Sequence, residues 1–247
     1  MAISHNPIFN RSLSTGLAAQ QDQQRVDDEF ARITNPMTVE GTSSKVFAMF
    51  LAVLAGVAVT WAFNLSWLFL PAMFVGLGLG LWASFSKQVR PGLMLAYALV
   101  QGVFVGGISL LFESMYPGIA QTAVVATLVT AGAMFLAYRF GLVRVNAKFT
   151  RFMMFAIIGY FAFSLINLGF ALFTNNSIYA SEFGWIAALI GVGLAAFTLN
   201  LDFEQIRVGV EQRWPEEMEW RAAFGLTATL LWLYVEILRL LAIFNRE

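Results

Sequence analysis

Long apolar runs, separated by short charged or turn-forming segments, dominate this 247-residue chain. A helix that crosses the hydrocarbon core of a bilayer needs about 20 predominantly apolar residues. Lys45 and Lys87 enclose 41 uncharged residues, and a turn-like segment at 64–67 divides them into two such runs. Glycines at 76, 78, 80, 102 and 106 lie within the runs and indicate close helix packing. The pattern predicts an all-α integral membrane protein with seven transmembrane helices, at residues 45–63, 67–86, 91–113, 118–138, 151–173, 183–206 and 220–244.

Basic residues provide a test of this topology, because lysine and arginine collect in the cytoplasmic loops of membrane proteins. Here they occur in alternate connections, and the turns at 64–67, 114–118 and 174–184 contain none. This distribution predicts a cytoplasmic N-terminus, and a C-terminus on the other side if the last span crosses completely. That span carries Glu236 and Arg239, so the alternative is a re-entrant segment that is buried among the other helices or lines a wet cavity.

The first 44 residues differ from the rest of the chain. They are polar, rich in Gln, Asn, Ser and Asp, and lack the basic and apolar layout of a signal peptide. Such a composition is typical of disordered segments. We therefore expect residues 1–44 to form a largely disordered cytoplasmic leader, and residues 45–247 to form the membrane domain.

Composition narrows the function further. The chain is 59% hydrophobic and only 12% charged, whereas soluble domains are about 25% charged, which excludes a soluble enzyme. Its 15 basic and 15 acidic residues cancel, so nothing favours a nucleic-acid partner. Because the chain has no cysteine and His5 is its single histidine, it lacks the residues for thiolate chemistry, common zinc sites and histidine-based hydrolysis. We expect no enzymatic activity and no cofactor.

Two carboxylates inside the predicted spans are the main functional candidates. Ionisable residues in hydrocarbon cost roughly 2.5–3.5 kcal/mol each on insertion scales, so they face the bundle interior, form pairs or mark an ion pathway. Asp202, near the end of span six, is either such a site or an interfacial carboxylate that reaches water. Glu236, in span seven, is either a site or the ion-pair partner of Arg239 one helical turn away. We expect Glu113 to be interfacial and Glu204 to be solvated.

Two carboxylates brought together in a low-dielectric interior would hold a proton near neutral pH unless a cation replaced it. Calcium suits such a pair because it prefers oxygen ligands, and Asn167 and Asn200 either supply further oxygens or join helices by hydrogen bonds. Asp202 and Glu236 are 34 positions apart, however. If both helices run straight from a turn near Trp214, the side chains differ in depth by roughly 16 Å, too far to share a proton. A shared site thus requires a break in span six or a deeper start of span seven.

Three motifs resemble those of one family. They are residues 201–206 (Leu-Asp-Phe-Glu-Gln-Ile), residues 106–109 (Gly-Gly-Ile-Ser) and residues 233–241, which include Glu236. In their order and spacing they resemble the Bax inhibitor family, also called the transmembrane Bax inhibitor motif family. The leader segment Asn6-Pro7-Ile8-Phe9 is similar to that of a bacterial branch, which implies a location in the bacterial cytoplasmic membrane.

The resemblance implies a seven-helix bundle whose last helix is central and wrapped by two three-helix layers. It further implies a pH-sensitive calcium leak in which Asp202 and Glu236 sense protons and bind calcium. In the family an arginine at the cytoplasmic end of span two can latch the span-six aspartate in the closed form. Here Arg90 is preferred over Lys87 for that role, and Arg239 is a further ion-pair candidate. The chain departs from the family in having Glu236 where aspartate is usual, and in a longer connection between spans six and seven.

A second class of function remains open from the sequence. The protein could be a non-conducting interaction protein that binds membrane proteases or other partners through its leader and cytoplasmic loops. The positions of the motifs favour the leak, and the outer turns offer protein partners little charge. For the leak, the expected partners are the lipid bilayer, calcium and protons.

Overall fold

The computed structural model of the chain describes residues 35–174, 179 and 184–246, together with six residues between 19 and 26. Most of the predicted leader, with His5 and the Asn6–Phe9 motif, lies outside the described residues, as does most of the turn at 174–184. Helix α2 begins at Val39, six residues before the predicted start of the first span. The N-cap residue Thr38 fixes this start, because its hydroxyl accepts a hydrogen bond from the Gly41 N–H at 2.9 Å.

Within the described residues, seven helices are long and apolar enough to cross a membrane, as the apolar runs predict. The chain is therefore a multi-pass membrane protein. The helices are α2 (Val39–Ala62), α3 (Phe69–Phe85, preceded by the 3-10 turn η1, Ser66–Leu68), α4 (Pro91–Met115), α5 (Ile119–Arg139), α6 (Ala147–Thr174), α7 (Gly184–Glu211) and α8 (Met218–Phe244).

Helix α8 is unbroken, which favours a complete crossing over a re-entrant segment for the last span. Its 27 residues extend about 40 Å at 1.5 Å per residue, more than the roughly 30 Å thickness of the hydrocarbon core. The helix therefore has the length of a complete crossing, although Glu236 and Arg239 lie within it. Two other helix ends follow from local chemistry: Pro91 occupies the first turn of α4, and Gly118 precedes α5 with a left-handed φ of 87°.

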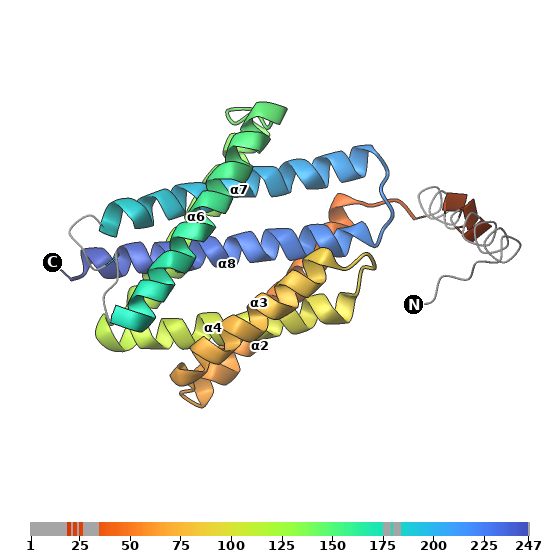
Figure 1. Cartoon of the computed structure of the whole chain (residues 1–247). Coiled ribbons are helices and arrows are strands. Elements are labelled where there is room, and N and C mark those ends of the chain that lie inside the picture. The colour runs from red at the N-terminus through yellow and green to blue at the C-terminus, as the bar shows by residue number, and fades with distance from the viewer. Residues whose placement is uncertain are drawn as a thin grey trace, which may run out of the picture.

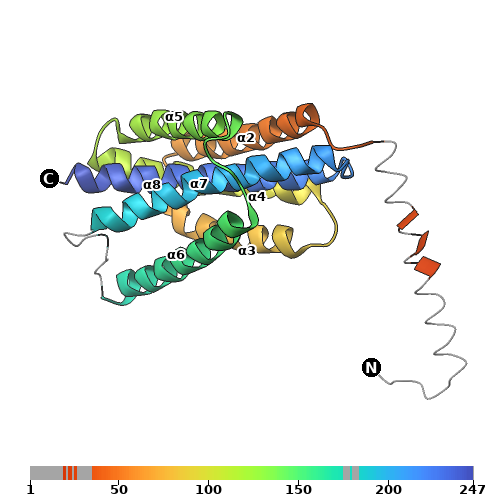
Figure 2. The same ribbon diagram turned by 90° about the horizontal axis from the view of Figure 1, so that it is seen from above.

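Helix α8 packs against α2, α4, α5 and α7. In Figure 1 it runs between α7 and α4, and α6 crosses α7 obliquely. In Figure 2, α2 and α5 lie on one face of the bundle, whereas α3 and α6 lie on the opposite face. Helix α3 packs mainly on α4, and α6 on α7. The specific arrangement of two three-helix layers around the last helix stays a prediction.

Small residues allow α2 and α4 to approach closely, as the glycine pattern indicates. A Cβ atom at Gly56 would overlap the Leu99 carbonyl of α4, and one at Gly102 would overlap the Val53 carbonyl of α2. A Cβ at Gly106 would lie 3.0 Å from Thr60. The interpretation of Gly102 and Gly106 as packing positions is therefore confirmed. Gly78 is the exception, because a Cβ there would meet nothing within 4 Å.

Candidate functional site

Asp202 lies in α7, where it faces the neighbouring helix α8. A Cβ atom at Gly225 of α8 would come 3.4 Å from Asp202 Oδ1, so no side chain separates the carboxyl from the α8 backbone there. Asp202 Oδ2 is buried, and among the described residues no group hydrogen-bonds to it. Thr229, one turn along α8, is its polar neighbour. A buried carboxylate oxygen is costly unless a proton, a cation or a water molecule compensates it, which makes Asp202 a candidate site.

Glu236 is held by a set of polar and aromatic side chains. Its side chain accepts hydrogen bonds from Tyr160 Oη at 2.8 Å, Trp232 Nε1 at 3.1 Å and Arg239 Nη1 at 2.8 Å, and the residue is only 3% exposed. The Arg239 guanidinium also lies 4.4 Å from the centre of the Tyr179 ring. The ion pair with Arg239 that the i, i+3 spacing indicates is therefore present.

The two acids are not brought together. Glu236 faces Gly191 of α7, where a Cβ atom would lie 2.6 Å from Glu236 Oε2. Asp202 lies eleven residues further along the same uninterrupted helix (191 to 202), which corresponds to about 16 Å. This separation agrees with the depth difference expected from their spacing in the sequence. In this conformation Asp202 and Glu236 form two separate sites, and neither a proton nor a calcium ion is shared between them.

The candidate latch residues lie in the connection between α3 and α4. Among the described residues no basic side chain forms an ion pair with Asp202. Arg90 stacks on Trp82, with its guanidinium 5.9 Å from the ring centre. The carbonyls of Ser86 and Lys87 accept hydrogen bonds from Nη2 of Arg221, the latter at 3.2 Å. Arg221, which the sequence did not single out, thus ties the connection that bears both candidates to α8.

Asn200 does not add a ligand to the Asp202 site. Asn200 is fully buried, donates to the Phe197 carbonyl at 3.3 Å and leaves its own Oδ1 without a hydrogen-bond partner within the described part of the chain. Two residues correspond to about 200° around a helix, so Asn200 and Asp202 point in different directions. Asn167, on α6, is 9% exposed. No three Asp, Glu, His or Cys side chains converge as a metal site in the region that the structure describes.

Two further acids have defined structural roles. Glu113 accepts hydrogen bonds from the backbone N–H groups of Gly118 at 2.6 Å and Ala120 at 3.0 Å, and so caps the N-terminus of α5. Glu204 accepts from Tyr138 Oη at 2.6 Å and pairs with Arg207. We expected Glu113 to be a plain interfacial residue, but it makes a specific contact that depends on the turn before α5. We expected Glu204 to be solvated, but it makes a specific contact that depends on the packing of α5 against α7.

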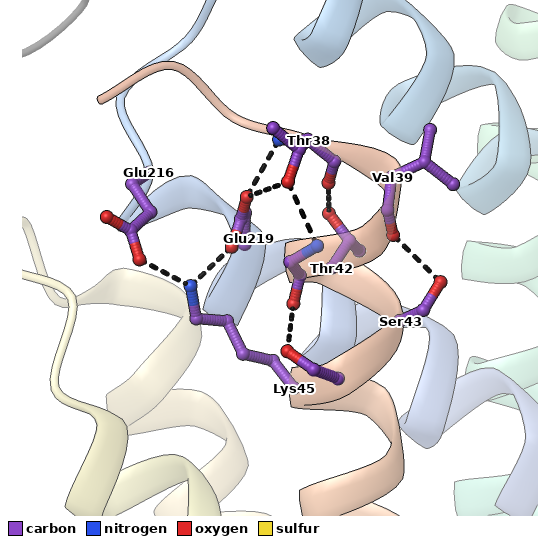
Figure 3. Close-up of polar contacts among 9 residues, drawn as sticks. Thr38, Val39, Thr42, Ser43, Lys45, Glu216 and Glu219 are labelled. Carbon is purple, nitrogen blue, oxygen red and sulfur yellow. Dashed lines mark hydrogen bonds and ion pairs between the residues drawn. The ribbon is translucent and has the colours of Figure 1, made fainter. Parts of the chain in front are cut away.

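A polar cluster at the start of α2 was not expected from the sequence. We call Thr38, Lys45, Glu216 and Glu219 the Lys45 cluster (Figure 3). Glu219 is 1% exposed and accepts hydrogen bonds from the backbone N–H of Thr38 at 2.7 Å and from its hydroxyl at 3.1 Å. Lys45 Nζ pairs with Glu219 and, at 3.1 Å, with Glu216.

The Lys45 cluster joins the first membrane-spanning helix to the last. Its partners are separated by more than 170 positions in the sequence, so no local spacing indicates it. Gly41 is part of the arrangement, because a Cβ atom there would overlap the Glu219 carboxylate. Beside the cluster, the Met37 N–H donates to the Trp214 carbonyl at 2.7 Å, which holds the segment before α2 against the α7–α8 connection.

The seven apolar helices and the buried intramembrane carboxylates define a multi-pass, all-helical membrane protein with charged groups in its interior. The family model described as Bax inhibitor 1 like matches residues 6–246, nearly the whole chain. The chain belongs to this family, as its motifs indicated. No curated protein matches the chain.

Proposed function

We propose that this protein is a calcium leak of the membrane, gated by protonation and ion pairing of its intramembrane carboxylates. The observation that carries the proposal is Asp202, whose buried Oδ2 atom has no hydrogen-bond partner among the described residues. A proton or a cation would compensate this oxygen, and both are supplied by the solution. Membership of the family supports the proposal, because the resemblance that identified it implies such a leak.

Calcium enters this proposal as the transported ion and not as a resident cofactor, since no cluster of three ligating side chains is present in the described residues. Asp202 would bind it transiently, a role for which one carboxylate is suited because release must remain fast. Protonation of Asp202, or pairing with Arg90 or Lys87, would close this position. Arg221 would transmit movement of the α3–α4 connection to α8, because it donates to the carbonyls of Ser86 and Lys87.

Glu236 has a different role in this proposal. It is already neutralised by Arg239 and held by Tyr160 of α6, so its protonation would release α6 from α8 rather than open a cation site. Because Asp202 and Glu236 are about 16 Å apart, their effects on flux are expected to be independent.

The test is calcium flux into liposomes that contain the purified protein, scanned from about pH 5 to 8, the range in which perturbed carboxylates titrate. Asp202→Asn is expected to lower the flux severalfold and to flatten its pH response, since a neutral amide cannot exchange a proton for a cation. Glu236→Gln is expected to shift the response without abolishing it, and the double variant to combine the two effects multiplicatively.

Glu217→Gln is the matched control, because Glu217 is an exposed carboxylate at the start of α8 without a side-chain capping bond. Equal effects of this substitution and of Asp202→Asn would contradict the assignment of Asp202. If flux never exceeds that of empty liposomes, the leak is wrong, and the non-conducting interaction protein becomes the better proposal.

A further inference from the structure

A groove between α2, α5 and α7 lies outside the site described above. Its volume is about 480 Å³, within the roughly 300–1,000 Å³ of common ligand sites. Its floor is apolar, and polar side chains gather at the end where α2 begins and where α5 and α7 end. The floor includes Val46, Phe135, Phe203 and Leu226, and the polar end includes Tyr138, Arg207 and Glu211.

We propose that this groove binds one phospholipid with a primary-amine headgroup, a phosphatidylethanolamine. Its walls belong to helices that are long and apolar enough to span the membrane, and part of its lining is open to the outer surface of the bundle. Val39 and Phe135, on two of its walls, are about half exposed, at 51% and 50%. An acyl chain can therefore enter sideways from the bilayer and cover the apolar floor.

The polar end of the groove presents charges of both signs, as a zwitterionic headgroup does. Arg207 pairs with Glu204 and Glu211, each at 2.6 Å, so these three side chains together carry a charge of −1. Three of the five guanidinium N–H groups donate to these carboxylates, and the others can donate to a lipid phosphate. The Glu211 side chain is 58% exposed and can accept from an ammonium group.

This charge pattern separates the amine lipid from other common phospholipids. Phosphatidylglycerol brings a phosphate but no cation to balance the second carboxylate. Phosphatidylcholine brings a quaternary ammonium, which has no N–H to donate to Glu211. Of these three headgroups, only phosphatidylethanolamine brings a primary ammonium beside a phosphate, which satisfies both the guanidinium and the carboxylate.

The bound lipid would lie directly beside Asp202. Phe203 and Leu226, in the floor of the groove, are the chain neighbours of Asp202 and of Gly225, which faces it. The inference does not depend on calcium conduction, however, because it concerns lipid binding alone.

The experiment is native mass spectrometry of the delipidated protein with equal amounts of the three lipids, matched in acyl chains. We expect the wild-type protein to retain one phosphatidylethanolamine in preference to the other two. Val46→Trp fills the groove and is expected to abolish this adduct. Val75→Trp is the matched control, because Val75 is a lipid-facing residue of α3, 53% exposed and outside the groove.

Glu211→Gln provides a second variant that leaves the groove open. Since Glu211 is exposed at the end of α7, we expect the protein to fold normally but to lose the preference for the amine lipid. The proposal is overturned if Val46→Trp and Val75→Trp retain the lipid equally, or if the wild-type protein binds the three lipids without preference. It is equally overturned if Glu211→Gln keeps the full preference.

Discussion

At the scale of single residues, Gly191 shows how closely the polar groups around Glu236 are packed. A Cβ atom at this position would overlap Tyr160 Oη and would lie 2.6 Å from Glu236 Oε2. Two residues further along α7, a Cβ atom at Gly193 would meet nothing within 4 Å. The two glycines lie on the same helix and in similar sequence, so they form a natural pair for comparison.

Gly191→Ala is expected to lower the free energy of unfolding by about 1–3 kcal/mol, because the added methyl group pushes Tyr160 away from Glu236. Gly193→Ala is expected to be neutral or to stabilise by up to about 1 kcal/mol, since alanine is the better helix former. Unfolding of both variants in mixed detergent micelles measures the difference. Equal stability of the two variants would show that the contacts around Gly191 are looser than described.

At the scale of helices, the Lys45 cluster couples α2 to α8. Lys45→Met would leave the buried Glu219 carboxylate without its basic partner, while the two hydrogen bonds from Thr38 remain. Removing one member of a buried ion pair costs about 3–5 kcal/mol. We expect this loss in the unfolding free energy, together with faster amide exchange at the start of α2.

Glu216→Gln is the control for that substitution, because Glu216 contacts the same lysine but its side chain is 56% exposed. An exposed pair contributes about 1 kcal/mol or less, so this variant is expected to remain close to wild type. If Lys45→Met is equally mild, the charge of Glu219 is compensated by water and not by the lysine.

The helices themselves were predictable from the sequence, because membrane spans depend on the length of apolar runs and on little else. The spans at 91–113 and 118–138 lie within two residues of α4 and α5. The separation of Asp202 from Glu236 was predictable too, since two straight antiparallel helices fix depth by residue number.

The partners of the buried charges were not predictable in the same way. Arg239 follows Glu236 by one turn, so their pair can be anticipated, but Tyr160 reaches Glu236 from another helix. The Glu219 contacts with Thr38 and Lys45 require the α7–α8 connection to lie against the start of α2. Such contacts depend on the three-dimensional path of a loop. The pattern of apolar residues along the sequence does not indicate that path.

At the scale of the whole molecule, seven spans place the ends of α4 and α8 on the same side of the membrane. Pro117 and Gly118, after α4, line one pocket together with Asn245 after α8. The distribution of basic residues predicts that this side is external and that the loops around residues 88 and 144 are cytoplasmic.

The absence of cysteine from the sequence makes this topology directly measurable. Single variants Met115→Cys and Asn245→Cys are expected to react with a membrane-impermeant maleimide in intact cells. Gln88→Cys and Arg144→Cys are expected to react only after the membrane is permeabilised. The opposite labelling pattern would show that the protein has the inverse orientation in the membrane. If Asn245→Cys, like Gln88→Cys, reacts only after permeabilisation, α8 does not cross the membrane.

The Lys45 cluster can form only late in the synthesis of the protein. Glu219 follows Lys45 by 174 positions, so the ammonium of the first span waits for its buried partner until the last span emerges. At about 5–20 residues per second, that interval is roughly 10–35 seconds. Through this time the nascent chain holds a lysine near the start of its first membrane helix without the carboxylate that neutralises it. A ribosome that pauses before residue 219 would therefore leave Lys45 without Glu219, and the contact between α2 and α8 forms only after α8 has been made.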